Sequence, residues 1–123
     1  WAQEIELMID LGKLRQIVEN LVGNAVKYTT EGEVSIRAEV RATPQGPREL
    51  LIVVADTGIG IPQDVQDRVF EPFFRAAQTS RKDGLGLGLA IVKSLVTKLG
   101  GHVELKSGVG EGTTVSVVIP LVE

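Results

Sequence analysis

The 123-residue sequence has no cysteine, one histidine and few aromatic residues: one tryptophan, one tyrosine and three phenylalanines. Without cysteine there is no disulfide, no thiolate metal site and no thiol nucleophile, which is compatible with a reducing cytosol and with the cytoplasmic location that we expect. No apolar run approaches the ~20 residues of a membrane-spanning helix, and no basic-then-apolar leader is present. The formal net charge of −3 provides no general positive field, so we expect no nucleic-acid partner and no direct membrane contact from this chain.

The composition, with 43% hydrophobic and 24% charged residues, is typical of one globular domain, which we place at residues 1–123. The sequence begins at Trp1 rather than at a methionine. We therefore expect this domain to be excised from a longer protein, with a membrane anchor elsewhere left open. As an isolated unit we expect it to be a monomer.

Periodicity predicts a helix, two strands, a second helix and two further strands. Residues 11–28 repeat apolar side chains at helical spacing, residues 33–42 alternate apolar with polar, and Leu50 to Ala55 form a continuous apolar run typical of a central strand. A short helix is expected after Pro62, a longer one up to Leu99, and two strands around a hairpin within residues 102–120. This order predicts an α+β two-layer sandwich, with a mixed or mostly antiparallel sheet and helices on one face.

The stretch DGLGLGLAIVKSL, residues 83–95, places Gly84, Gly86 and Gly88 at the start of the second long helix. Each glycine in a helix costs roughly 0.8 to 1.0 kcal/mol relative to alanine, so three glycines at the N-terminus of one helix need an explanation. Glycines permit close backbone approach, and the free N–H groups of a helix N-terminus favour an anion such as phosphate. The spacing matches neither a dinucleotide fingerprint nor a P-loop, and a purely structural turn is the alternative.

A polar stripe runs along the first helix beside its apolar face. At 100° per residue, Asn20, Asn24 and Lys27 fall together on one flank. An ordinary solvated face is the alternative, but asparagine is a poor helix former, so two of them cost propensity without a visible structural gain. Neutral amide oxygens can ligate Mg²⁺, and a lysine can meet a phosphate.

Asp56 directly follows the apolar run and precedes the sequence TGIGI. A capping or turn role is the alternative for an aspartate beside glycines. A carboxylate accepts hydrogen bonds only, so at the end of a rigid strand it could receive the exocyclic amine of adenine while the glycines admit the flat ring.

Together these stretches resemble the catalytic, ATP-binding domain of two-component sensor histidine kinases. NLVGNAVKY is similar to the N box of that family, DTGIGI to its G1 box, FEPFFR to its F box and GLGLGLAIV to its G2 box, in the family's order. The closing GEGTTVSVVIP resembles the family's last hairpin, so the resemblance covers essentially the whole chain. It implies the Bergerat fold of the GHKL superfamily and a site for Mg²⁺ and ATP.

The resemblance also implies individual roles. Asn24 would be the main Mg²⁺ ligand with Asn20 assisting, and Asn24, Lys27 and Arg75 would form the catalytic set, with Lys27 on a phosphate and Arg75 facing the γ-phosphate. Asp56 would read adenine. The remaining nucleotide-binding residues implied by the family are Tyr28, Gly58, Gly60, Ile61, Gly84, Leu85, Gly86, Leu87, Gly88 and Thr113.

The glycine-rich stretch would then be a lid hinge and phosphate cradle. Leu85 stands where many members of the family have a small hydroxyl residue, which removes a side-chain hydrogen bond there. Phe70, Phe73 and Phe74 would hold the lid against the body of the domain, with core packing as the alternative. Residues 75–84 have no useful periodicity and are expected to be mobile.

The implied activity is transfer of the γ-phosphoryl group of ATP to a histidine on a separate dimerisation and phosphoacceptor domain, upstream of a response regulator. That histidine is absent from this sequence, because His102 lies at the start of a strand and is not expected to be an acceptor. Glu19 is expected to be a solvated or partner-facing carboxylate.

Three alternatives stay open: a non-catalytic nucleotide-sensing module, an anti-sigma-type serine kinase and an ATPase clamp of the gyrase or chaperone type. Asn20 argues against the clamp, in which a glutamate is expected at that position to activate water.

Overall fold

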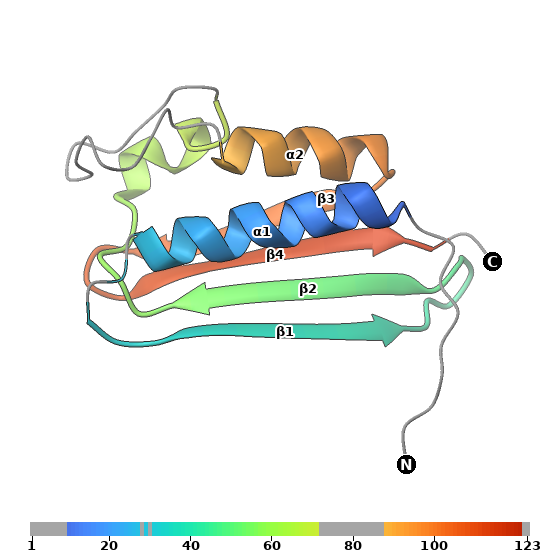
Figure 1. Cartoon of the computed structure of the whole chain (residues 1–123), viewed down its shortest axis with the longest axis horizontal. Helices are drawn as coiled ribbons and strands as arrows, with labels where there is room; N and C mark the ends of the chain where they lie inside the picture. Colours follow the sequence, from blue (N-terminus) through green and yellow to red (C-terminus); the bar gives the residue numbers. More distant parts are fainter. Residues whose placement is uncertain (1–9, 28, 30, 72–87, 122–123) are drawn as a thin grey trace, which may run out of the picture.

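The computed structural model describes residues 10–27, 29, 31–71 and 88–121. Two helices lie on one face of a four-stranded sheet, which is the predicted two-layer arrangement (Figure 1). The elements are, in chain order, α1 (Leu11–Lys27), β1 (Val34–Arg41), β2 (Glu49–Asp56), the 3-10 helix η1 (Gln63–Arg68), α2 (Gly88–Lys98), β3 (His102–Gly108) and β4 (Gly112–Pro120).

The strands form one sheet in the order β1-β2-β4-β3, and all three pairings among the described strands are antiparallel. The sequence predicts a mixed or mostly antiparallel sheet, and the antiparallel form is what the structure has. Strand β2 lies between β1 and β4, as its apolar sequence predicts, since a central strand is covered by neighbours on both edges.

Asp10 is the N-cap of helix α1. The Asp10 Oδ1 atom accepts a hydrogen bond from the backbone N–H of Lys13 at 3.1 Å, and the Asp10 carbonyl accepts one from Leu14 at 3.0 Å. The Lys13 side chain also donates to Asp10 Oδ2 at 2.8 Å. These contacts, the side-chain bond from Lys13 first, hold the pKa of Asp10 below its ordinary value.

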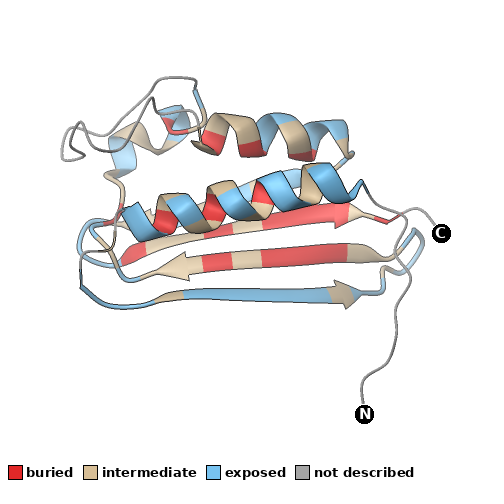
Figure 2. Cartoon of the chain, in the orientation of Figure 1, coloured by how far each residue is buried: buried red, intermediate tan, exposed pale blue. Residues whose placement is uncertain are grey.

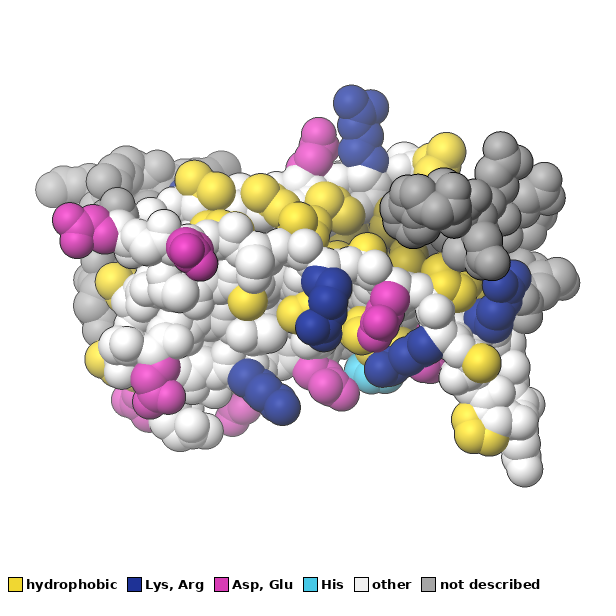
Figure 3. All heavy atoms as spheres, turned by 90° about the horizontal axis from the view of Figure 1, so that it is seen from below, with side chains coloured by type: hydrophobic (Ala, Val, Ile, Leu, Met, Phe, Trp, Pro, Cys, Tyr) yellow, Lys and Arg dark blue, Asp and Glu magenta, His cyan; other side chains and the backbone are white. Residues whose placement is uncertain are grey.

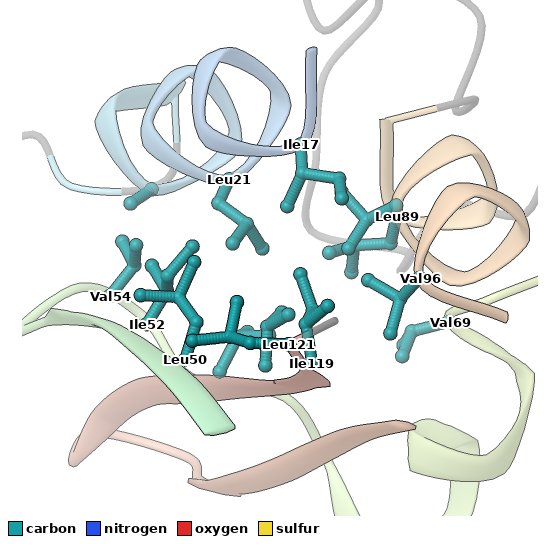
Figure 4. Close-up of a cluster of buried hydrophobic side chains, with 14 residues drawn as sticks. Ile17, Leu21, Leu50, Ile52, Val54, Val69, Leu89, Val96, Ile119 and Leu121 are labelled. Carbon is teal, nitrogen blue, oxygen red and sulfur yellow. The ribbon is translucent and has the colours of Figure 1, made fainter. Parts of the chain in front are cut away.

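The core lies between the helices and the sheet (Figure 4). Alternate residues of each inner strand point toward α1 and α2, and the corresponding stripe of each helix is buried, shown in red in Figure 2. The buried cluster consists of Ile17, Leu21, Ala25, Leu50, Ile52, Val54, Val69, Leu89, Val92, Val96, Val115, Val117, Ile119 and Leu121.

The other face of the sheet is not covered by a described helix. Strand β1 places Arg37, Glu39 and Arg41 there, all exposed, and the view from below shows charged side chains of both signs scattered over the surface (Figure 3). Leu51 and Val118, which are paired on this face, are nevertheless 8% and 4% exposed. The inner strands of the sheet therefore bury apolar side chains on both faces.

The segment after Pro62 is the short helix that the sequence predicts, and it is of the 3-10 type. It forms the 3-10 helix η1, with Val65 N–H bonded to the Pro62 carbonyl at 3.1 Å and no side-chain cap at Pro62. Only six residues separate Pro62 from the buried Val69, and such short connectors commonly adopt the tighter helix.

Helix α2 ends where the two glycines predict. The Gly100 N–H donates to the Thr97 carbonyl at 3.0 Å and the Gly101 N–H donates to the Val96 carbonyl at 2.9 Å. Within the described part of the chain, no helix combines the length and apolarity needed to cross a membrane.

Candidate functional site

Four segments that the sequence singles out meet at one end of the molecule. The C-terminal end of α1, the N-terminal end of α2, the end of β2 and the connection between β3 and β4 all lie at the left in Figure 1. The strand order explains this, because β2 and β4 are antiparallel neighbours: the end of one is beside the start of the other.

The two asparagines of α1 face the start of α2. A Cβ atom built on Gly88 would lie 3.9 Å from Asn20 Oδ1 and 3.9 Å from Asn24 Oδ1. The Asn20 amide donates to the Gln16 carbonyl at 2.7 Å, which fixes the side chain with its oxygen toward Gly88. Two neutral oxygens thus lie beside the helix N-terminus, where backbone N–H groups favour an anion.

Asp56 and Thr113 face each other across the sheet at the same end. They are direct partners in the pairing of β2 with β4, and both are half-buried. Asp56 Oδ1 accepts a hydrogen bond from the Gly58 N–H at 2.8 Å, so one carboxylate oxygen shapes the turn that follows. Among the described residues the second oxygen makes no hydrogen bond, which leaves it available to a ligand.

The loop at residues 56–61 is fixed against the β3–β4 hairpin by its backbone. The Gly110 N–H donates to the Ile59 carbonyl at 3.0 Å, and the Ile61 N–H donates to Ser107 Oγ at 2.8 Å. A Cβ on Gly60 would overlap the Gly108 carbonyl oxygen, so only glycine permits this approach. Gly60 and Ile61 therefore shape the wall of the site through backbone contacts.

A second anchor holds the same loop on the side of β1. Thr57 Oγ1 accepts from the Glu33 N–H at 2.9 Å, and the Thr57 N–H donates to the Glu33 carbonyl at 3.1 Å. A Cβ on Gly32 would overlap Thr57 Oγ1. The loop is therefore tied on both sides, which makes it a rigid wall rather than a free turn.

Sequence reasoning missed three residues that build this site: Thr57, Gln66 and Ser107. The Gln66 side-chain amide donates to the carbonyls of Ile61 at 2.8 Å and Ser107 at 2.9 Å. No local signal marks Ser107, which stands between Lys106 and Gly108, or Gln66, which stands between Val65 and Asp67. The contacts that join Ser107 to Ile61 and to Gln66 span 46 and 41 residues of the chain. That pairing cannot be read from local periodicity.

Several predicted site residues lie outside the described part of the chain: Tyr28, Phe73, Phe74, Arg75, Gly84, Leu85, Gly86 and Leu87, together with the segment 75–84 that is expected to be mobile. Lys27 is the last residue of α1 and is exposed. Phe70 packs against the core, and the Lys93 ammonium lies 5.7 Å from its ring centroid, which supports the packing alternative for this phenylalanine.

His102 lies on the opposite face of the sheet from the two asparagines, and Glu19, which directly precedes Asn20 on α1, is turned to solvent. His102 pairs with Val118 and faces the side of the sheet that no described helix covers, so the sheet separates it from α1. Glu19 is exposed and its carboxylate lies 3.6 Å from the Arg15 guanidinium. Within the described ranges, no three histidine, cysteine or acidic side chains come together to hold a metal, so a cation here would need the amide oxygens.

Curated relatives with similar sequences are sensor kinases. The chain is 44% identical over 110 residues to the sensor histidine kinase AtsR of Burkholderia thailandensis, covering 88% of this chain and 18% of that protein. It is 50% identical over 103 residues to the sensor histidine kinase AruS of Pseudomonas aeruginosa, covering 82% of this chain and 10% of that one. The chain thus spans less than a fifth of the length of either relative.

Solved structures agree with the fold. Full-length ShkA in complex with AMPPNP superposes with a TM-score of 0.77 at 39% identity, covering 94% of this chain and 23% of that one. The mycobacterial sensor histidine kinase MprB gives a TM-score of 0.76 at 36% identity, covering 94% of this chain and 76% of that one. A family model described as histidine kinase-, DNA gyrase B- and HSP90-like ATPase matches residues 9–123, and the chain belongs to that family.

Proposed function

We propose that this chain binds Mg·ATP and transfers its γ-phosphoryl group to a histidine on a separate phosphoacceptor domain. The observation that carries the proposal is the meeting of Asn20 and Asn24 with Gly88, each amide oxygen 3.9 Å from the position of a Cβ on that glycine. Oxygen ligands beside a helix N-terminus match a metal-bound triphosphate. Family membership and the AMPPNP complex of ShkA support the same ligand.

The residues present fit Mg²⁺. This cation prefers oxygen ligands and usually keeps several waters, with further ligands from substrate phosphates. Asn24 and Asn20 would hold it, and the bound ion would neutralise charge on the phosphates. Two neutral amides suit that role because they add no negative charge beside an anionic substrate.

The nucleotide base would lie against the loop at residues 56–61. At the end of β2, Asp56 offers a carboxylate oxygen to which no described residue donates a hydrogen bond, with Thr113 opposite it. Carboxylate oxygens accept from an exocyclic amine and cannot donate to a carbonyl, so this wall favours adenine. Gly58, Gly60 and Ile61 shape the surface on which the ring would rest.

In the transfer step a ring nitrogen of the acceptor histidine bonds to the γ-phosphorus as the bond from phosphorus to the bridging oxygen breaks. The attacking nitrogen is the one that carries no proton. ADP leaves with the electron pair of the broken bond, and the other ring nitrogen then releases its proton to solvent. Such a reaction leaves the protein mainly positioning and charge stabilisation. We assign those tasks to Asn24, Lys27 and Arg75, with the backbone of residues 84–88 around the phosphates.

The partners that this proposal requires are a histidine-bearing dimerisation and phosphoacceptor domain of the longer protein and a downstream response regulator. The sensor kinases AtsR and AruS, both much longer than this chain, support such an arrangement. In the family's usual architecture the phosphoacceptor histidine is supplied by a separate domain, which agrees with the placement of His102 away from the asparagines.

The test is transfer from γ-labelled ATP with and without the histidine-bearing hairpin of the longer protein. We expect almost no label on the chain itself, His102 included, and slow acid-labile labelling of the hairpin, because separation removes the effective concentration that a linker provides. Robust labelling of the chain itself would contradict the proposal.

The same assay separates the alternative functions. A serine kinase would leave acid-stable phosphate on its substrate, and an ATPase clamp would release inorganic phosphate without any hairpin. A nucleotide-sensing module would bind ATP and transfer nothing. Each result therefore points to a different class of protein within the same fold.

A further inference from the structure

Asp56, Thr113 and Ser107 form one polar row across three strands. Thr113 pairs directly with Asp56 in β2 and with Ser107 in β3, so all three side chains point to the same face of the sheet. Val54 lies two residues before Asp56 and Val115 lies two residues after Thr113. Both point the same way as the row, into the core beneath the helices. The row is thus the polar end of the apolar interior.

Ser107 has a complete set of hydrogen bonds within this row and the adjoining loop. Its Oγ atom donates to the Gly112 carbonyl at 2.9 Å and accepts from the Ile61 N–H at 2.8 Å. Thr113 Oγ1 lies 2.8 Å away. A serine hydroxyl has one proton, and that proton is used on Gly112, so the hydroxyl of Thr113 is the donor in the bond between the two side chains.

The proton count fixes what Thr113 can offer a ligand. Once its single proton is directed to Ser107, its oxygen has only lone pairs left and can act only as an acceptor. Asp56, on the neighbouring strand, presents carboxylate oxygens, which are acceptors. The row therefore turns two acceptors, and no side-chain donor, toward the position that the proposed function assigns to the base.

We propose that Ser107 is a specificity-determining positioning residue for the nucleotide. Ser107 accepts the hydrogen bond of the Thr113 hydroxyl and so leaves Thr113 only an acceptor for the base. The site then favours a purine with an exocyclic amine over one with a carbonyl oxygen at that position. This rests on the proposed ATP site. Ser107 acts through Thr113 and through the Ile61 backbone.

The test compares the affinities of this chain for ATP and ITP, which differ by an amine and a carbonyl oxygen on the base. Calorimetry should show tighter binding of ATP to the unmodified chain. In Ser107→Ala the Thr113 hydroxyl is free to donate to the carbonyl of ITP. We expect the ratio of the two dissociation constants to fall about threefold to tenfold, the range for one hydrogen bond.

Two controls separate this effect from loosening of the loop. Gln66→Leu removes the two hydrogen bonds that the Gln66 amide donates to the carbonyls of Ile61 and Ser107 but leaves the Ser107 hydroxyl in place, so both nucleotides should weaken by the same factor and the ratio should stay constant. Ser107→Thr restores a hydroxyl and should restore the ratio. In a Thr113→Val background, Ser107→Ala should have no further effect on it.

The outcomes are distinguishable. Failure of the unmodified chain to bind either nucleotide would overturn the proposed function itself. If ATP binds but Ser107→Ala leaves the ratio unchanged, or changes it equally in the Thr113→Val background, the role of Ser107 is wrong while the ATP site stands. Should Ser107→Ala fail to fold, the ratio in Thr113→Val decides the case, because an unchanged ratio there excludes Thr113 from base selection.

Discussion

Asp56 and Thr113 lie directly opposite each other at the end of the β2–β4 pair, although the sequence separates them by the whole of α2 and β3. On one side of this pair the carboxylate of Asp56 shapes the following turn, and on the other the hydroxyl of Thr113 bonds to Ser107. The end of the sheet thereby becomes a polar recognition surface on an otherwise apolar interior.

Asp56→Asn should weaken ATP binding without unfolding the chain. Asparagine keeps an oxygen for the Gly58 N–H but replaces the second acceptor with a donor, which then opposes the amine of adenine. An unpaired group in a partly buried site costs about 1 to 3 kcal/mol, so we expect roughly a 5-fold to 150-fold loss of affinity. Calorimetry measures this loss, and thermal unfolding of the same sample checks that folding is retained. An unchanged affinity would show that Asp56 does not contact the base.

Gly112→Ala should disturb the site by a steric route. Gly112 has a φ of 84°, and a Cβ there would overlap the Asp56 carbonyl oxygen. Gly110 is the matched control, since its φ is 80° but a Cβ on it would meet nothing within 4 Å. Both alanines carry the backbone cost of about 1 to 2 kcal/mol.

Urea unfolding of the two variants measures the difference between them. Gly112→Ala should lose more free energy of unfolding than Gly110→Ala and should also weaken ATP binding, because its overlap displaces Asp56. Equal losses in the two variants would mean that β2 and β4 can separate locally at no cost, which is contrary to a rigid loop at residues 56–61.

The sequence predicts the fold well where local pattern and tertiary packing agree. The apolar stripe of α1 and the apolar run of β2 are buried as predicted. The alternation in β1 correctly predicts a strand, but Ile36 and Ala38 on its apolar side are exposed, because β1 lies at the edge of the sheet. For the segment after Pro62 the sequence predicts a short helix but not its type, because six residues carry too little periodicity to distinguish a 3-10 helix from an α-helix.

The site is predicted in part. The pairing of Asn20 with Asn24 one turn later is visible in the sequence because both lie on one helix. The link from Ser107 to Ile61 and Thr113 is not visible, because it depends on the register of three strands. The roles of Arg75 and Tyr28 stay predictions, since both lie outside the described residues.

Ile17→Ala should destabilise the whole domain. Ile17 is 0% exposed, and its side chain lies between α1 and α2 beside Leu89 in the buried cluster (Figure 4). Removing a buried isoleucine side chain to alanine costs about 2 to 5 kcal/mol, a large fraction of the roughly 5 to 15 kcal/mol of a typical domain. Val26→Ala on the same helix is the control, because Val26 is 58% exposed. Urea midpoints that fall equally in both variants would contradict the assigned packing.

Asn24→Ala should remove the dependence of ATP binding on Mg²⁺. In the unmodified chain, ATP should bind more tightly with Mg²⁺ than with excess chelator, because the ion joins the amide oxygens of α1 to the phosphates. Loss of the Asn24 oxygen should reduce the affinity with Mg²⁺ by about tenfold or more, the order expected for a lost contact to a charged group. The affinity in chelator should change little. Glu19→Ala, an exposed change on the same helix, is the control and should keep the full Mg²⁺ effect. If Asn24→Ala retains that effect, the metal is held elsewhere, and the two asparagines facing Gly88 have another role.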